Sequence, residues 1–315
     1  MSARPRVGAS VDLGSNSVHL LVAAIAGHRL RPIVDESAFL GLGAAVDGRA
    51  HLGAAARAEL VATLLGYVTT ARQLGATMIT LLGTEPIRRA ADAARIVGDI
   101  ERTTRVPLHV LSHEEEAFLT LIGVTDGRPV TRETLVVDIG GGSSEFCAVP
   151  PRGHARAAGL RLGSNRLTAR FVTGDPPTAA EVVAMTAAAD EAMAGAMDAH
   201  PREIVAVGGT ASNLLKVAPG GVVDPLLTRA RLAEALATVL DEPAAVTSER
   251  YGVNPTRARI LPAGAVIVDS LMRRYGATSV RVSDAGMREG AVLIADHVGL
   301  AWRDRLEELA HGWRD

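Results

Sequence analysis

Two similar segments of the sequence restrict its fold more than any other feature. VDLGSNSVHLLV begins at Val11 and VDIGGGSSEFCA begins at Val137, so Asp12 is matched 126 residues later by Asp138. In each copy an apolar run ends in an aspartate, a glycine-containing turn follows, and a second apolar run begins. Such repetition predicts a duplicated unit, and its alternation with amphipathic helical segments predicts an α/β fold. We therefore expect two α/β units whose glycine turns face a cleft between them.

The length and composition fit two soluble domains. The 315 residues are 48% hydrophobic and 22% charged, and the net charge of −2 argues against a general nucleic-acid binder. No apolar run is long enough to cross a bilayer, and MSARPRVGAS contains no apolar segment of signal-peptide length. The single cysteine, Cys147, excludes an internal disulfide. These features predict a cytoplasmic protein that binds neither membranes nor nucleic acid.

Apolar periodicity and turn residues predict the order of elements. We expect strands within 7–25, 31–37 and 77–82, and helices over 54–74, 87–103 and 114–124. In the second half we expect helices over 178–199, 228–240 and 257–275. The polar segment TDGRPVTRE predicts a boundary between domains 1–125 and 126–315, with the last helix free to pack on the first domain.

The glycine turns have the composition of phosphate-binding loops. Glycine lets phosphate oxygens approach main-chain N–H groups, and a neighbouring carboxylate can hold Mg²⁺. The alternatives are a hairpin with a glycine bulge for the second loop and an ordinary tight turn for the third. We select three candidate loops: Asp12 with Gly14, Ser15, Asn16 and Ser17; Asp138 with Gly140, Gly141, Gly142, Ser143, Ser144 and Glu145; and Gly208, Gly209 and Thr210.

Two charged clusters are candidates for catalysis. LSHEEEAFL contains three consecutive glutamates at a predicted helix start, of which one is expected in the cleft as a general base. TEPIRRAAD contains Arg88 and Arg89, of which one is a candidate phosphate clamp. The alternative for both clusters is a solvated helix start, and periodicity does not choose among their members.

Lysine, histidine and cysteine give no further candidate for catalysis or metal binding. Lys216 is the only lysine, and no GxxxxGK[ST] motif is present. The histidines show no metal-ligand spacing, so His19 and His113 are expected to be structural. Cys147 shares the strand parity of Glu145 and is expected to serve packing.

With these motifs in order, the chain resembles the Ppx/GppA phosphatase family, whose members are exopolyphosphatases and guanosine pentaphosphate phosphohydrolases. The resemblance runs from Val7 to about Val298 and includes the segments VDLGSNSVHLLV, TEPIRRAAD, SHEEEA, VDIGGGSSE, LRLGSNRLTARF, DPPT, VGGTASNL, RILPAGAVIVDSLM and VSDAGMREG. It implies two ribonuclease H-like domains of the actin–hexokinase–Hsp70 superfamily, facing an interdomain cleft.

The resemblance also implies roles for individual residues. Glu116 matches the catalytic base and Arg88 the phosphate-binding arginine. Asp138 and Glu145 match positions that hold Mg²⁺, for which Mn²⁺ is a substitute, and that orient the attacking water. Asp12 matches the first loop and is a further metal candidate.

Some positions depart from the family pattern. SSE replaces the commoner Ser-Thr-Glu, and His113 stands where many members have glycine. The helical C-terminal extension of longer members, which contributes to polyphosphate binding and dimer contacts, is not matched here. We expect an exopolyphosphatase that prefers shorter chains, with a homodimer among its expected assemblies. The alternatives are a guanosine pentaphosphate (pppGpp) phosphohydrolase, a non-catalytic sensor and a kinase of the same superfamily.

Overall fold

The computed structural model describes residues 6–313, which form two compact units. One unit contains the described residues up to Val130 and those from Ala285 onward, and the other is Thr131–Asp284. The junction at 130 lies in the predicted linker. The C-terminal residues contact the first unit because α12 (Met287–Val298) packs on α5 and β1. The predicted second domain runs to residue 315, with its last helix free to pack on the first domain.

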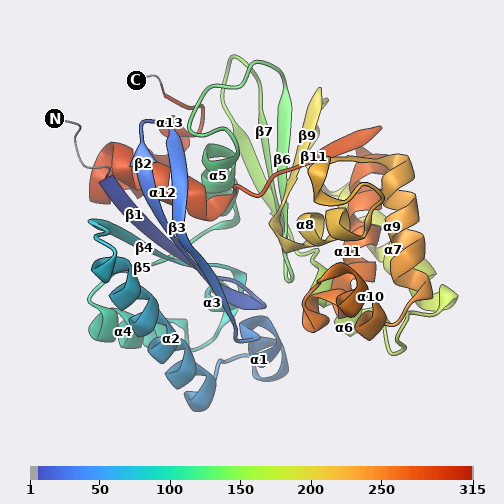
Figure 1. The fold of residues 1–315 in the computed structure, drawn as a ribbon, viewed down its shortest axis with the longest axis horizontal. Coiled ribbons are helices and arrows are strands. Elements are labelled where there is room, and N and C mark those ends of the chain that lie inside the picture. The colour runs from blue at the N-terminus through green and yellow to red at the C-terminus, as the bar shows by residue number, and fades with distance from the viewer. Residues whose placement is uncertain (1–5, 314–315) are drawn as a thin grey trace. The chain divides into compact units, whose positions relative to one another are not determined.

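The first unit is built on a five-stranded mixed sheet with the order β3-β2-β1-β4-β5 (Figure 1). Strands β1, β2 and β3 pair antiparallel, and β1, β4 and β5 run parallel. The strands are β1 (Arg6–Leu13), β2 (Ser17–Ala26), β3 (Arg29–Phe39), β4 (Met78–Gly83) and β5 (Leu108–Val110). The helices are α1 (Leu42–Arg49), α2 (Ala54–Gln73), α3 (Glu85–Arg89), α4 (Ala93–Thr104), α5 (His113–Val124) and α12, with η2 (Gly299–Arg305) and α13 (Leu306–Leu309) at the end.

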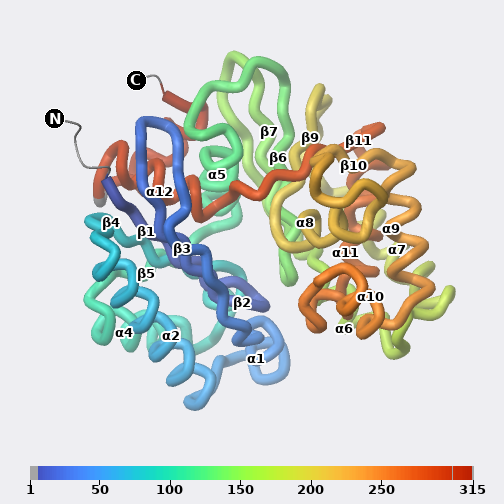
Figure 2. Tube along the Cα trace, viewed as in Figure 1, coloured from blue at the N-terminus to red at the C-terminus, as the bar shows by residue number. Residues whose placement is uncertain are grey.

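Strand alternation gives this sheet two different faces. Val11 and Leu20 belong to a core that also contains residues of α2 and α4. Leu21, Ala23 and Ile25 point to the opposite face, where they pack with Val292 of α12. Both faces of the sheet are therefore covered by helices, as an α/β layered fold requires. Figure 2 shows the C-terminal segment, in red, beside β1 and α5, in agreement with their contacts.

The second unit repeats this arrangement with a six-stranded sheet of order β10-β11-β9-β6-β7-β8. Its strands are β6 (Thr134–Ile139), β7 (Ser144–Val149), β8 (Arg156–Leu160), β9 (Glu203–Val207), β10 (Leu226–Thr228) and β11 (Ser279–Val282). The helices are α6 (Ser164–Phe171), α7 (Ala179–Ala194), α8 (Gly208–Val217), η1 (Gly221–Val223), α9 (Arg229–Asp241), α10 (Ala244–Tyr251) and α11 (Pro255–Arg274). Read from β8, the order β8-β7-β6-β9-β11 matches β3-β2-β1-β4-β5. The predicted duplicated α/β fold is confirmed.

Two predicted helices differ from the structure. The helix expected over 87–103 is two helices, α3 and α4, because Ala90 adopts extended backbone (ψ 129°) between them. The helix expected over 178–199 ends at Ala194, followed by a Gly195 C-cap. Helices α1, α6 and α10 were not predicted. They are eight-residue helices, too short for a clear apolar period.

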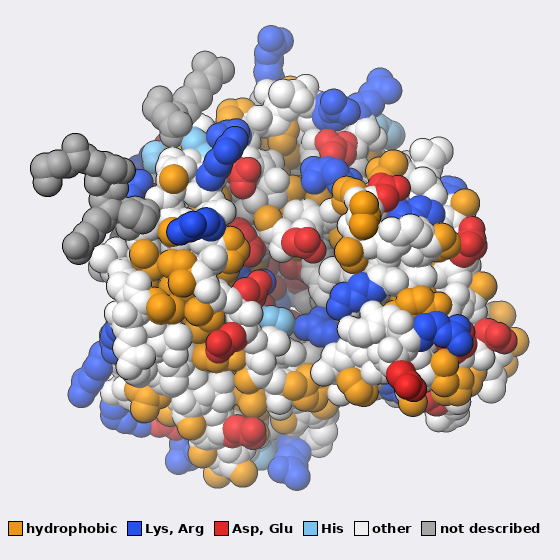
Figure 3. All heavy atoms as spheres, viewed as in Figure 1, with side chains coloured by type: hydrophobic (Ala, Val, Ile, Leu, Met, Phe, Trp, Pro, Cys, Tyr) orange, Lys and Arg blue, Asp and Glu red, His pale blue; other side chains and the backbone are white. Residues whose placement is uncertain are grey.

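The surface is mixed in charge. Basic and acidic side chains are interspersed over the face that Figure 3 shows, as a net charge of −2 leads one to expect. Within residues 6–313, no helix is both long and apolar enough to span a bilayer.

The thiol of Cys147 should be inert in the folded protein. Cys147 is fully buried in β7, and burial raises the pKa of its thiol to about 12. A raised cysteine pKa leaves stability unchanged below the unfolded value of about 8.5 and lowers it above that pH. We expect a thiol reagent at pH 8 to leave the native protein unmodified and to label one group per chain in denaturant. Labelling of the native protein at the rate of free cysteine would contradict this burial.

Candidate functional site

The first unit gathers its candidate residues at one edge of the sheet. Strands β1, β4 and β5 are parallel, so their carboxyl ends meet there. Asp12 lies at the end of β1, α3 follows β4, and α5 follows β5. The Thr84 hydroxyl joins two of these ends by donating to the carbonyl of Leu13 at 2.9 Å. The chain topology thus brings Asp12, Arg88 and Glu116 to the same edge.

The carbonyl groups of the first glycine loop accept hydrogen bonds from the segment between β3 and α1. The carbonyl of Asn16 accepts from the N–H groups of Leu40 and Gly41 at 3.1 and 2.9 Å, and the carbonyl of Ser15 accepts from Gly43 at 2.9 Å. The segment between β3 and α1 therefore fixes the backbone of the loop. A loop fixed by its carbonyls is preorganised to present N–H groups on its other side.

Glu116 and Arg88 form the central ion pair of this edge. Glu116 is 7% exposed, and its carboxylate accepts from Nη1 of Arg88. The same Nη1 donates to the carbonyl of Leu111, and Nη2 lies 3.0 Å from Nδ1 of His113. Arg88 is therefore held by three groups, one of which is the histidine that departs from the family pattern.

The structure separates the members of both charged clusters. Glu114 is exposed, and Glu115 pairs with Arg303 at 2.5 Å, which leaves Glu116 as the buried glutamate of the three. Arg89 pairs with Glu85 and Asp47, both at 2.7 Å. Among the clustered candidates, only Glu116 and Arg88 contact each other. Which glutamate and which arginine meet depends on where each lies relative to the ends of β4 and β5. Apolar periodicity in the sequence does not report that position.

In the second unit, two carboxylates lie opposite each other on neighbouring strands. Asp138 of β6 pairs in register with Glu145 of β7, so their side chains share one face of the sheet. Glu145 is 4% exposed, and burial raises the pKa of Asp138 to about 6. Two carboxylates on one face of the sheet, of which Asp138 is disfavoured in its ionised form by burial, fit a hard divalent cation. These residues are suited to hold a divalent metal ion.

The second glycine loop is fixed in the same manner as the first. The carbonyl of Gly140 accepts from the N–H of Ser164, and that of Gly141 from the N–H of Arg166, both at 3.1 Å. The Arg166 side chain donates through Nε to the carbonyl of Gly142 at 2.9 Å. Within the described residues, the N–H groups of residues 141–143 donate to no main-chain carbonyl. The start of α6 thus holds the carbonyl side of the loop and leaves its N–H side open to an anion.

The third loop, residues 208–210, opens helix α8 and lies close to Asp138. Gly208 has φ +91°, and a Cβ there would lie 2.5 Å from Oδ1 of Asp138. The loop also contacts Arg257 of α11, because a Cβ on Gly209 would lie 1.5 Å from its Nη1. No motif in the sequence indicates a role for Arg257. The available signal was its spacing from Gly264, two helical turns later, which packs on Thr210.

The duplication is not chemically symmetric. His19 lies opposite Asp12 in the first sheet, in the register where Glu145 lies opposite Asp138 in the second. The two units therefore present an aspartate at the same place, but only the second adds an acid across the strand pair. The carboxylate set that suits a metal is consequently richer in the second unit.

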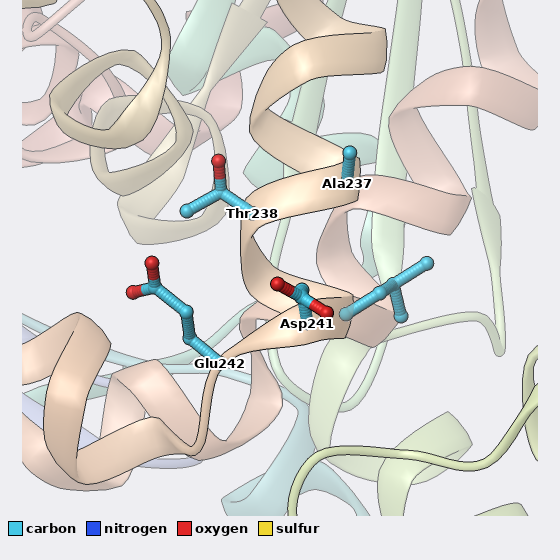
Figure 4. Close-up of a pocket in the computed structure, with 5 residues that line it drawn as sticks. Ala237, Thr238, Asp241 and Glu242 are labelled. Carbon is cyan, nitrogen blue, oxygen red and sulfur yellow. The ribbon is translucent and has the colours of Figure 1, made fainter.

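A separate depression lies at the end of α9. Its volume is about 520 Å³, and Figure 4 shows the side chains around it. It is lined by Ala237, Thr238, Leu240, Asp241 and Glu242. None of these residues belongs to a glycine loop or a charged cluster described above, and we assign the depression no role.

Known proteins resemble this chain over most of its length. The Ppx/GppA phosphatase family matches residues 21–296. "Exopolyphosphatase 1" of Mycobacterium tuberculosis is 29% identical over 297 residues, which are 90% of this chain and 86% of the relative. The protein of the same name from Mycobacterium leprae is 28% identical over 301 residues, 90% and 87% of the two chains. The crystal structure of the Aquifex aeolicus family member is similar with a TM-score of 0.80 and 26% identity, covering 91% of this chain and 96% of that one.

These likenesses agree with the topology, since the duplicated sheets are those of the actin-like fold that the Aquifex structure shares. The family match begins within β2 and ends within α12. It includes the second and third glycine loops and both charged clusters, whereas Asp12 and the first glycine loop precede it. The chain belongs to the Ppx/GppA phosphatase family, and it is an enzyme of that phosphatase class.

Proposed function

We propose that this enzyme removes the terminal phosphate of inorganic polyphosphate, with Mg²⁺ as its metal. The observation that carries the proposal is the pairing of buried Glu116 with Arg88 at the sheet edge where Asp12 and the first glycine loop lie. A carboxylate kept beside a cation suits a base that acts on water next to an anionic substrate. The mycobacterial relatives named exopolyphosphatase support the choice of substrate.

In the proposed reaction, the protein contributes positioning and one proton transfer. N–H groups of the two hairpin loops and of the Gly208–Thr210 turn bind oxygens of the terminal phosphoryl group, and Arg88 meets their charge. Glu116 takes a proton from the attacking water as the new P–O bond forms and the anhydride P–O bond breaks. Phosphate and a polyphosphate shorter by one unit leave.

Three carboxylates are proposed to serve the metal. Asp138 and Glu145, together with Asp12, would hold Mg²⁺, which offsets negative charge on the phosphate oxygens when it is bound. The raised pKa of Asp138 supports this assignment, because a cation nearby would stabilise the ionised form that burial disfavours. Glu145 would also orient the attacking water.

The test is phosphate release from tripolyphosphate, long-chain polyphosphate and guanosine pentaphosphate in Mg²⁺, with EDTA as the control. We expect release from both polyphosphates, a higher kcat/KM for the shorter one, and loss of turnover with EDTA. A higher kcat/KM for guanosine pentaphosphate would replace the proposed substrate. Binding without release would indicate a sensor, and transfer of label from ATP to an acceptor other than water would indicate a kinase.

A further inference from the structure

The C-terminal residues lie along the helix that carries Glu116. After α12, the chain continues through η2 and α13, and α13 packs against α5, as the red and green segments of Figure 2 show. Trp302 is 1% exposed and Leu306 is 2% exposed, so this segment is packed on the first unit. We call Trp302 and Arg303 the C-terminal brace.

Arg303 ties the first turn of α5 to the strand before it. Its Nε and Nη2 donate to the two carboxylate oxygens of Glu115 at 2.5 and 2.8 Å, and Nη2 also donates to the carbonyl of Val110 at 2.9 Å. Glu115 is itself part of the capping box of α5, because it accepts from the N–H of Ser112 at 2.8 Å. Bidentate pairing of this kind fixes orientation as well as distance.

Trp302 supports the same junction from the side of β5. Its ring meets the ring of His109 edge to face, with centroids 5.0 Å apart. Burial raises the pKa of Glu115, but hydrogen bonds from Arg303 and Ser112 outweigh it, and the resulting pKa is lowered. Glu115 is therefore ionised at neutral pH and able to keep its contact with Arg303.

The other end of α5 is held independently. A Cβ on Gly123 would lie 1.9 Å from the carbonyl oxygen of Gly286, and one on Gly290 would lie 1.9 Å from that of Leu119. This close glycine packing fixes the body of α5 against α12. This packing does not hold the first turn of α5, from which the side chain of Glu116 projects.

We infer that Arg303 is a positioning residue that orients Glu116 through Glu115. Successive residues of a helix differ in direction by about 100°, so holding the side chain and backbone of Glu115 sets the direction of Glu116. The backbone agrees, because the Glu116 N–H donates to the Ser112 carbonyl within the same capped turn. The inference depends on the proposed function, in which Glu116 is the base.

Replacing Arg303 by glutamine should lower kcat for phosphate release on the order of tenfold and leave KM within about twofold, because a displaced base acts only in the transition state. Arg305→Gln is the matched control. It removes an ion pair to Glu308 at 2.6 Å in the same segment, without touching α5, and it should leave kcat unchanged.

Glu115→Gln tests the pair from the other side, since glutamine preserves the capping box and removes the charge. It should lower kcat as Arg303→Gln does, and the double variant should lose no more than either single one. Hydrogen exchange at the amides of residues 114–117 should be faster in Arg303→Gln and unchanged in Arg305→Gln. Equal kcat in Arg303→Gln and Arg305→Gln, or a raised KM at constant kcat, would overturn the inference. If the wild-type protein releases no phosphate, the proposed function fails, and the exchange comparison alone decides whether the brace exists.

Discussion

Replacing Glu116 by glutamine should reduce kcat for phosphate release by about 10²–10⁴-fold, because the variant retains the size of the side chain but loses the general base. Glutamine still offers an oxygen to Arg88, so the fold at this edge should persist. KM should stay unchanged or fall, since Arg88 no longer shares its charge with a carboxylate. Steady-state kinetics on tripolyphosphate measure both quantities.

Glu114→Gln is the control for this experiment. Glu114 lies in the same helical turn and is exposed, so its replacement should leave kcat within about twofold. If Glu116→Gln and the wild type hydrolyse tripolyphosphate at equal rates, Glu116 is not the base. A loss of the same size in Glu114→Gln would show that the charge of the helix start matters, rather than one carboxylate.

The duplicated fold was predictable because it rests on short-range features. Apolar runs ending in aspartate and glycine at Asp12 and Asp138 identified β1, β2, β6 and β7, which the structure places in matching registers. The break between α3 and α4 was not predictable in this way. Ala90 has no intrinsic preference for the extended backbone that it adopts, and the apolar pattern continues across it.

The candidate site also has parts that local sequence motifs predict and parts that depend on tertiary packing. Glycine, acid and arginine motifs select the segments of the candidate site, since their composition indicates the chemistry that they can perform. Periodicity does not choose Glu116 over Glu114, and the prediction of Glu116 rests on the family resemblance. The burial that separates the two residues depends on how α5 packs. Arg257 and Arg303 were missed because their partners, Gly209 and Glu115, are 48 and 188 residues away in the chain, a separation that no local pattern reports.

Gly163→Ala should both destabilise the second unit and weaken phosphate binding. A Cβ on Gly163 would lie 2.3 Å from the carbonyl oxygen of Gly141 and 2.6 Å from the N of Gly142. These are backbone atoms, so α6 and the glycine loop must move apart. The backbone of Gly163 is extended, with φ −150°, and alanine adopts it without strain. Steric overlap is therefore the only change.

We expect the free energy of unfolding to fall by about 2–3 kcal/mol, as for other overpacked sites. KM for tripolyphosphate should rise about tenfold, because the carbonyls of the loop lose their fixed partners at the start of α6 and its N–H groups lose alignment. Denaturant unfolding and steady-state kinetics measure the two effects. Gly98→Ala is the matched control: nothing lies within 4 Å of a Cβ at Gly98, inside α4, so alanine should stabilise the protein by about 0.5–1 kcal/mol. A Gly163→Ala variant that resembled Gly98→Ala in both measurements would mean that the second loop does not depend on α6 for its shape.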